Sequence, residues 1–289
     1  MTKISTRRFL QIAGLATAGL LLAACGKKEP VAVPAQAAAA SAPAPAPAKV
    51  YVVGTDAAYA PFESQNEKGE IVGFDVEVVQ AVAKKAGIEV KFVNTPWEGI
   101  FNALGQGDRD MVVSAVTITE ERKGTMDFSD PYFDAQQLIA VKDNSKVAKF
   151  ADLKKLKVGV QTGTTGDEAV TKLMGKTSNN IKRFESTPLA LKELEAGGVD
   201  AVVADNGVII HYVANNPGGK FKTVADKEFV PEQYGIALKK GNSELQGKLN
   251  KGLAEIKADG SYDAIYSKYF GAAPAKAGAA MAPASAASK

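Results

Sequence analysis

Polar side chains suited to binding a zwitterion follow several short apolar runs in this chain of 289 residues. Arg122 carries a planar guanidinium, which matches a carboxylate through two parallel hydrogen bonds. The hydroxyls of Thr117, Thr164 and Thr165, with the free N–H groups of a helix start, add donors for the same anion. Asp205 can receive an ammonium group. Together these groups predict a pocket for a free α-amino acid.

Each of these signals also has a purely structural interpretation. Arg122 could form a surface ion pair with a neighbouring acid such as Glu120 or Glu121. The threonines could only cap the helix that follows them, and Asp205 could cap the next helix. A nucleotide site is disfavoured, because the glycine-containing stretch 161–166 has no lysine near its end, as a phosphate loop requires. A carboxylate therefore fits this stretch better than a phosphate.

Short apolar strands that alternate with amphipathic helices must position these side chains. In the helix expected at about 75–86, Phe74, Val78 and Val82 fall on one face. The alternation occurs twice along the chain, which predicts two α/β lobes with parallel sheets covered on both faces. Ligands of such sheets bind at the carboxyl ends of the strands, where the polar residues above lie.

The expected elements cover the middle of the chain. We expect strands at 50–53, 88–93, 111–115, 138–141, 158–160, 181–184, 201–204 and 234–238. We expect helices at 75–86, 98–104, 165–174, 188–196, 207–214, 243–258 and 262–269.

Composition excludes several classes of function. One cysteine and one histidine are too few for a zinc or redox-metal site, so we expect no metal and no cofactor. A single cysteine also excludes a disulfide within the chain, and a single histidine disfavours a Ser-His-Asp site. The formal net charge of +3 is too small to indicate binding to nucleic acid.

The N-terminus has the pattern of an export signal. The bases Lys3, Arg7 and Arg8 precede the apolar run 9–24, which is too short for a comfortable membrane span. The run ends in Leu-Ala-Ala-Cys25, which resembles a bacterial lipobox. That resemblance implies cleavage before Cys25 and lipid attachment to its sulfur, with acyl chains such as palmitate as the anchor. An ordinary secretory signal is the alternative, and the arginine pair leaves twin-arginine export open beside the general route.

Two Ala-rich segments flank the expected folded part, residues 49–271. Residues 25–48 end in alternating Ala and Pro, which favours an extended tether over a packed core. Residues 272–289 are Ala-rich in the same way, and we expect a disordered tail there. The 35 bases outnumber the 32 acids only because of the three bases in segment 1–24, so the mature chain would be formally neutral.

Six motifs spread over the folded part carry a resemblance to a known family. They are Gly-Phe-Asp-Val-Glu-Val at 73–78, the segment 56–62, Ile-Thr-Glu-Glu-Arg at 118–122, Phe-Ser-Asp-Pro-Tyr at 128–132, the segment 158–165 and Tyr-Ser-Lys-Tyr-Phe-Gly at 266–271. In combination they resemble the extracellular solute-binding proteins of polar amino-acid ABC transporters, family 3. The resemblance covers essentially all of residues 49–271.

The resemblance implies a two-lobed α/β periplasmic-binding-protein fold of type II. Residues 49–137 and 231–271 would form one lobe, and residues 138–230 the other. The ligand would lie in the cleft between them, and two crossing strands would act as hinges. We expect closure around the ligand to produce the state that a membrane permease recognises.

The resemblance also implies roles for individual residues. Arg122 would clamp the ligand carboxylate with Thr117 and Thr165, while Asp205 and the backbone near Ser114 or Ala115 would receive the ammonium. Tyr59 and Trp97 would sandwich the ligand side chain. Asp56 and Gln161 would contact the end of that side chain. Trp97 could equally be an ordinary core residue. The full expected set is Asp56, Tyr59, Trp97, Ser114, Ala115, Thr117, Arg122, Gln161, Thr164, Thr165 and Asp205.

We therefore expect a lipid-anchored, monomeric protein outside the cytoplasmic membrane, which binds a free polar L-amino acid and delivers it to an ABC permease. The first lobe has more acids than bases, which favours a basic or amide side chain, although solvated surface charge would explain this excess equally well. No catalytic residue is expected. The alternatives are a cyclohexadienyl-dehydratase-like enzyme on the same fold, which would need Glu98 or Asp56 as an acid or base, and a sensory ligand-binding protein.

Overall fold

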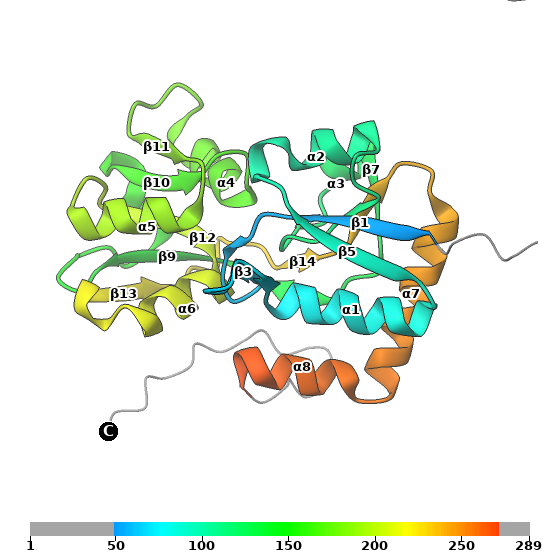
Figure 1. The fold of residues 1–289 in the computed structure, drawn as a ribbon. Coiled ribbons are helices and arrows are strands. Elements are labelled where there is room, and N and C mark those ends of the chain that lie inside the picture. The colour runs from blue at the N-terminus through cyan, green and yellow to red at the C-terminus, as the bar shows by residue number, and fades with distance from the viewer. Residues whose placement is uncertain (1–48, 272–289) are drawn as a thin grey trace, which may run out of the picture. The chain divides into compact units, whose positions relative to one another are not determined.

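The computed structural model of the chain describes residues 49–271. The expected signal, Cys25, the tether and the tail lie outside these residues. Within the described part, no helix is both long and apolar enough to cross a membrane. Two five-stranded sheets with their own helices make up most of it, as Figure 1 shows. We call the first sheet with its helices lobe 1 and the second sheet with its helices lobe 2.

Lobe 1 combines a mixed sheet with five helices. Its strands are β1 (Val50–Thr55), β5 (Glu89–Asn94), β6 (Met111–Val112), β7 (Met126–Phe128) and β15 (Ala237–Lys239). Its helices are α1 (Phe74–Ala86), α2 (Trp97–Gln106), α3 (Glu120–Thr125), α7 (Ser243–Ala258) and α8 (Ser261–Phe270). The strand order is β5-β1-β6-β15-β7, in which β15 runs antiparallel to both of its neighbours.

Lobe 2 repeats this design with a second mixed sheet. Its strands are β9 (Gln137–Lys142), β10 (Val158–Gln161), β11 (Ile181–Phe184), β12 (Ala201–Asp205) and β13 (Phe221–Val224). Its helices are α4 (Thr165–Met174), α5 (Thr187–Ala196), α6 (Asn206–Asn215) and the short 3₁₀ helices η1 (Phe150–Lys155) and η2 (Pro217–Gly219). The strand order is β11-β10-β12-β9-β13.

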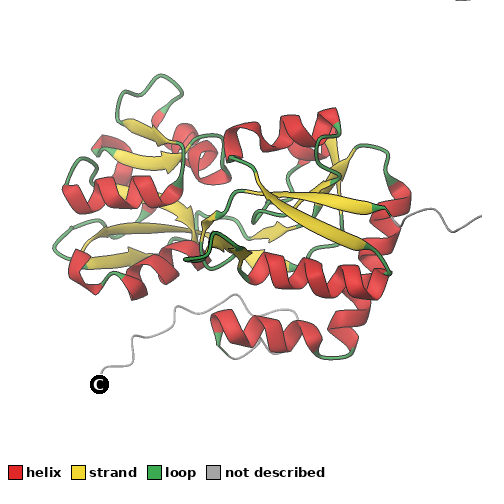
Figure 2. Cartoon of the chain, viewed as in Figure 1, coloured by secondary structure: helices red, strands yellow, loops and turns green. Residues whose placement is uncertain are grey.

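Alternating side chains on β9 show why helices cover both faces of the lobe 2 sheet (Figure 2). Ile139 and Val141 pack in one cluster with residues of α4 and η1. Leu138 and Ala140 point to the opposite face and pack in another cluster with α5 and α6. Successive side chains of a strand alternate between the two faces of the sheet, so an entirely apolar strand needs cover on both.

The prediction of parallel sheets is wrong for part of each sheet. In lobe 2, β9 runs antiparallel to β12 and β13, and in lobe 1, β15 runs antiparallel to β6 and β7. Every residue of β9 except the last is buried. A run buried on both faces has the same apolar pattern in either direction, so periodicity does not indicate the direction of the strand.

Two short strands carry the chain between the lobes. Strand β8 (Phe133–Ala135) leads from lobe 1 into lobe 2, and β14 (Glu232–Tyr234) leads back. They pair antiparallel, with Glu232 opposite Ala135. They are the two crossing hinge strands of the expected fold, and the two-lobed α/β class is confirmed. The single strand expected at 234–238 is wrong, because the chain divides at Gly235 into β14 and β15. A Cβ at position 235 would lie 2.9 Å from Cδ1 of Ile118.

Several short elements were not expected. A small antiparallel sheet contains β2 (Ala58–Tyr59), β3 (Glu63–Gln65) and β4 (Ile71–Val72). Strands of two or three residues are too short to show a period. Helix α2 continues to Gln106, beyond its expected end at 104, because its stop is Gly107 with a φ of 89°.

Candidate functional site

One cavity between the lobes gathers all eleven residues of the expected set. The free space inside it is small, about 20 Å³, which is little more than one water molecule needs. The lining residues are Asp56, Tyr59, Trp97, Ser114, Ala115, Thr117, Arg122, Gln161, Thr164, Thr165 and Asp205. In lobe 1 they lie after β1 and β6 or at the starts of α2 and α3. In lobe 2 they lie at the ends of β10 and β12 or at the start of α4. The carboxyl ends of the strands therefore meet at this cavity.

Arg122 supplies the positive charge of the cavity. Its Nη1 donates to the carbonyl oxygen of Thr117 at 2.9 Å, and its Nη2 donates across the lobes to that of Gly163 at 3.4 Å. The guanidinium carbon lies 5.4 Å from the ring centre of Trp97, within the range of a cation–π contact. Glu120 pairs with Lys123 at 2.8 Å, so the surface ion pair considered for Arg122 is not what the structure shows.

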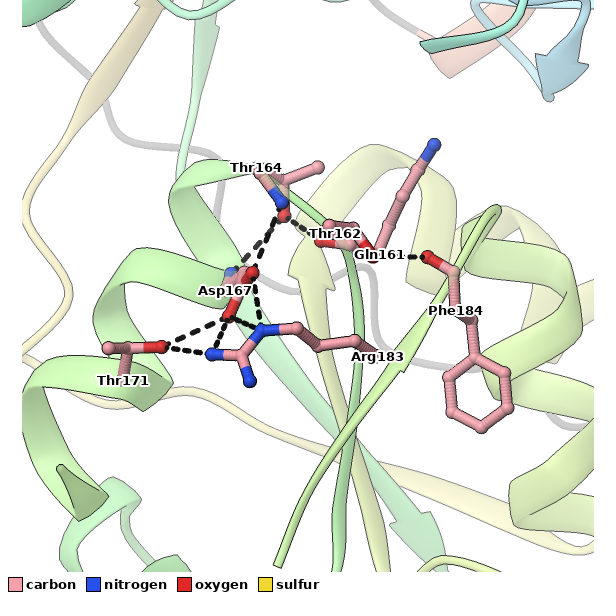
Figure 3. Close-up of polar contacts among 8 residues, drawn as sticks. Gln161, Thr162, Thr164, Asp167, Thr171, Arg183 and Phe184 are labelled. Atoms are coloured by element: carbon pink, nitrogen blue, oxygen red, sulfur yellow. Dashed lines mark hydrogen bonds and ion pairs between the residues drawn. The ribbon is translucent and has the colours of Figure 1, made fainter. Parts of the chain in front are cut away.

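Side chains of lobe 2 hold the start of α4 in place, as Figure 3 shows. Thr164 caps the helix by accepting from the backbone N–H of Asp167 at 3.2 Å, and its hydroxyl donates to the carbonyl of Gln161 at 2.9 Å. The Asp167 carboxylate accepts from the N–H of Gly163 and pairs with Arg183 at 2.9 Å. Thr164 thus both caps α4 and lines the cavity, because its capping bond fixes the loop that faces the cavity.

Asp205 supplies a buried acid at the opposite wall. Its carboxylate accepts hydrogen bonds from the hydroxyls of Tyr59, at 3.0 Å, and Tyr234, and from Nε2 of Gln137. The side chain makes no capping bond to α6, where the amide oxygen of Asn206 accepts from the next N–H. Burial, and then the charge of nearby Glu232, raises the pKa of the Asp205 carboxyl to about 6.

A second acid, Asp56, faces Gln161 across the lobes. Nε2 of Gln161 donates to Oδ2 of Asp56 at 3.3 Å, while the amide oxygen of Gln161 accepts from the hydroxyl of Thr187 at 3.0 Å. Burial raises the pKa of Asp56, and the hydrogen bond from Gln161 opposes this shift. The cavity therefore has acidic groups at two separate places.

The loop after β6 is backed by two fully buried acids. The hydroxyl of Ser114 donates to Glu63 at 2.8 Å, and the N–H of Ala115 donates to Asp75 at 2.8 Å. Burial raises the pKa of Glu63 well above its usual value and that of Asp75 to about 6. Burial thus favours the protonated form of both acids. This pair holds Ala115 in a left-handed conformation, with a φ of 46°, at the wall of the cavity.

The aromatic residues divide the remaining wall. Tyr59 is buried with its hydroxyl on Asp205. Trp97 is half-buried at the start of α2 and lies edge-on to Phe101, with ring centres 4.9 Å apart. Trp97 also packs beside the apolar cluster under α2, so it both lines the cavity and contributes to the core.

Comparison with known proteins places the chain in a family. Residues 51–272 match the model of the bacterial extracellular solute-binding proteins, family 3. The chain belongs to this family. A probable histidine-binding protein of Neisseria gonorrhoeae is 46% identical over 260 residues, which cover 89% of this chain and 94% of the relative. An L-arginine-binding protein of Pseudomonas aeruginosa is 33% identical over 224 residues, covering 75% and 86% of the two chains.

Solved structures agree with this assignment. The arginine-, lysine-, histidine-binding protein ArtJ of Geobacillus stearothermophilus superposes on this solute-binding protein with a TM-score of 0.76 and 48% identity, covering 78% of this chain and 97% of that one. An ancestral arginine-binding protein bound to arginine gives a TM-score of 0.73 and 46% identity, covering 77% and 98%. The two-lobed fold is therefore shared at high sequence identity.

One acid of this solute-binding protein was missed by the sequence analysis. Glu232, on the returning hinge strand β14, accepts from the hydroxyls of Thr117 at 2.7 Å and Thr165 at 2.9 Å. It also accepts from Nε2 of Gln137 at 3.1 Å. Glu232 neither follows a sheet strand nor lies in a family motif used above. Its place at the point where the chain crosses between the lobes is the signal that could have indicated it.

Proposed function

We propose that this protein binds a free basic L-amino acid between its lobes and delivers it to an ABC permease. One observation carries the proposal: Arg122 of lobe 1 and Asp205 of lobe 2 face the same small cavity, with a further acid, Asp56, at another part of its wall. One guanidinium and two carboxylates complement one carboxylate and two cationic groups. Arginine, lysine and histidine, in its protonated form, have this set of charges.

The ligand carboxylate binds to Arg122 and to backbone N–H groups at Thr117 and Thr165. Arg122 already lies over the ring of Trp97, and its second nitrogen reaches toward lobe 2. The first N–H groups of a helix have no partner within the helix, which makes the start of α4 a ready donor to an anion. Thr164 takes part by holding this start in place.

The ligand ammonium binds to Asp205 and to the backbone at Ser114 or Ala115. The side chain lies between the rings of Tyr59 and Trp97, and its cationic end meets Asp56 and Gln161. Relatives whose names state arginine, lysine or histidine binding support a basic side chain for this chain too. The acidic groups of the cavity support the same choice, since an amide ligand would leave Asp56 without a cationic partner.

The lobes close around the ligand by movement at β8 and β14. We assign residues 49–137 and 231–271 to one lobe and 138–230 to the other, which agrees with the strand composition of the two sheets except that β9 begins at Gln137. Several contacts already join the lobes at the cavity, among them those between Arg122 and Gly163, Asp56 and Gln161, and Tyr59 and Asp205. A ligand that contacts both lobes favours the closed state that the permease recognises.

We further propose that the protein acts as a monomer, is anchored outside the cytoplasmic membrane by lipid on Cys25, and catalyses no reaction. One candidate acid for catalysis, Glu98, is exposed and does not line the cavity. The other, Asp56, is used by the proposed contact to the ligand. A related solved structure is an amino-acid-binding precursor of cyclohexadienyl dehydratase, 41% identical. Turnover of a prephenate-like substrate by the purified protein would contradict the last proposal.

Titration calorimetry with the common amino acids tests the binding proposal. We expect arginine, lysine or histidine to bind, and Arg122→Ala and Asp205→Ala each to weaken binding by about 2–5 kcal/mol, because each leaves a buried charge without its partner. Lys123→Ala is the matched control, since Lys123 follows Arg122 but pairs with exposed Glu120. If no amino acid binds, or both cavity variants bind like the wild type, the proposal is wrong.

A further inference from the structure

We propose that Glu232 is a latch between the lobes: by holding Thr117 of lobe 1 and Thr165 of lobe 2 on one carboxylate, it stabilises the closed arrangement and positions the groups that meet the ligand carboxylate. This inference rests on the proposed function, because it concerns how that binding site closes. Glu232 would be a positioning residue, since it lies behind the cavity wall and is absent from the residues that line the cavity.

The geometry of the latch spans three parts of the fold. Oε2 of Glu232 accepts from Thr117 in the loop after β6, at 2.7 Å, and from Thr165 at the start of α4, at 2.9 Å. Oε1 accepts from Nε2 of Gln137 at the start of β9, at 3.1 Å. Glu232 itself is on a hinge strand. A single buried side chain thus joins both lobes at the line about which they turn.

Burial makes this arrangement cooperative. Glu232 is only 9% exposed, and its three partners are neutral hydroxyl and amide groups. A buried carboxylate depends on such hydrogen bonds, because each one lost leaves the charge poorly solvated. Since Thr117 and Thr165 belong to different lobes, opening the cleft must break the hydrogen bond of one of them to Glu232. The full set of bonds exists only in the closed arrangement.

The latch also determines which atoms of the two threonines can contact the ligand. A threonine hydroxyl has one proton to donate. In Thr117 and in Thr165 this proton points to Glu232. A ligand carboxylate is therefore left with the guanidinium of Arg122 and the backbone N–H groups, and not with these hydroxyls. Glu232 in this way fixes the orientation of both threonines before the ligand arrives.

Other contacts between the lobes differ from the latch in one respect. Asp205, Asp56 and Arg122 line the cavity, so a bound amino acid can replace or reorient their present contacts. Glu232 lines instead the larger groove that adjoins the cavity and shares Thr117 and Thr165 with it. Its contacts persist when the ligand binds, so they contribute to closure both with and without ligand.

The test compares Glu232→Gln with the control Glu228→Gln, using arginine as the probe. Glutamine has nearly the same shape, but only one of its two terminal atoms accepts a hydrogen bond, so it cannot accept from the threonines and from Gln137 at the same time. Glu228 is exposed and four residues away, so its variant removes the same charge without touching the latch. Trp97, the only tryptophan in the chain, lines the cavity and reports binding through its fluorescence.

We expect the dissociation of arginine from Glu232→Gln to be at least about tenfold faster, which corresponds to roughly 1.4 kcal/mol. Without arginine, we expect a larger radius of gyration by small-angle X-ray scattering, because more molecules are open. Glu228→Gln should match the wild type in both measurements. In the background of Thr165→Val the effect of Glu232→Gln should shrink, because half of the latch is already lost.

A pH profile separates the latch from a merely structural role. Asp205, Arg122 and Glu168 are the charged groups that interact with Glu232. Removing the charge of Glu232 eases the ionisation of Asp205, so the acid limb of arginine binding should move to lower pH in Glu232→Gln. A residue that only supports folding would change the melting temperature and leave this limb in place.

The outcomes are distinguishable. If Glu232→Gln releases arginine at the wild-type rate and has the wild-type radius of gyration, the latch is wrong. If the wild type binds no amino acid, the proposed function is wrong, and the radius of gyration of the unliganded proteins still decides on the latch. If Glu232→Gln does not fold by circular dichroism, Glu232→Asp replaces it, whose shorter carboxylate reaches only one lobe and should give the same faster release.

Discussion

At the scale of the residue, burial makes the few charges of the cavity depend on one another. Asp205 receives three hydrogen bonds and still has a pKa raised to about 6, because burial and the charge of Glu232 outweigh them. Burial also lowers the pKa of Arg122, while Glu168, Asp205 and Glu232 oppose this shift. In the unliganded protein these buried acids therefore raise one another's cost of ionisation, and the proposed cationic ligand would lower that cost.

The raised pKa of Asp205 predicts opposite effects of acid on binding and on folding. The carboxyl must be ionised to hold an ammonium, so arginine affinity should fall roughly tenfold per pH unit once the pH is below about 6. In the unliganded protein, ionised Asp205 destabilises the fold above that pH. This contribution should diminish as the pH falls from 6 toward the usual value of 3.8. Calorimetry and thermal unfolding across this range measure the two trends.

Asp205→Asn is the control for this prediction. It has no carboxyl to titrate, so its remaining affinity and its stability should both lose this part of their pH dependence. A wild-type affinity that stays constant down to about pH 4, below the shifted pKa, would contradict the assignment of Asp205 as the ammonium partner.

The residue scale also shows what the sequence could and could not predict about the site. All eleven expected residues line one cavity, because each follows a strand, begins a helix or lies in a motif whose position the fold fixes. Their contacts to a ligand stay a proposal. Glu232 was not predicted, because its partners Thr117 and Thr165 lie more than sixty residues away in the chain. No spacing rule connects such residues until the two lobes are placed together.

At the scale of the element, the helices were predictable because they have strong start and stop signals. The sheets were predicted less well. Helix α4 has the expected bounds of 165–174, and α7 those of 243–258. The directions of β9 and β15 were predicted wrongly, because apolar runs carry no direction. The hinge strands are only three residues long, so their roles depend on tertiary pairing rather than on local pattern.

The packing of α4 against β9 and β12 leads to a prediction about glycine. A Cβ at Gly166, in the first turn of α4, would lie 2.8 Å from Oε1 of Gln137 and 3.0 Å from the carbonyl oxygen of Val203. The backbone oxygen has no easy way to move. We expect Gly166→Ala to displace the helix start, to lower stability by about 1–3 kcal/mol and to weaken arginine binding. Thermal unfolding and calorimetry measure both effects.

Gly105→Ala is the matched control within another helix. Gly105 lies inside α2, and a Cβ added there would have no neighbouring atom within 4 Å. Alanine at this position should stabilise the protein by roughly 0.5–1 kcal/mol, because it reduces the freedom of the unfolded chain and suits a helix. Equal effects of the two substitutions would show that the start of α4 tolerates a Cβ at position 166.

At the scale of the whole molecule, the two lobes, the hinge and the family assignment describe a protein that works outside the cytoplasmic membrane. Lobe 1 contains both ends of the described chain, and lobe 2 lies between them in the sequence. Closure of the lobes therefore need not move the two ends of residues 49–271 relative to each other. A tether attached before residue 49 would leave the cleft free to open and close.

The proposed anchor gives a prediction at this scale. Cys25→Ser removes the sulfur that would carry the lipid, so the full-length protein should move from the membrane fraction to the soluble fraction. Mass spectrometry of the wild-type N-terminal peptide should show acyl groups on Cys25. Arginine affinity should not change, because the described cavity is formed by residues 56–205. A soluble wild type without acyl groups would contradict the anchor.

With the ligand bound as proposed, the placement of Arg122 and Asp205 on different lobes would make the ligand itself a cross-link. A molecule that keeps the side chain but lacks the carboxylate, such as the decarboxylated amine of arginine, can engage Asp205 and Asp56 while leaving Arg122 unsatisfied. It would join the lobes through its two cationic groups alone, without the contact at Arg122. Such amines should therefore bind more weakly than arginine and compete with it only at higher concentration.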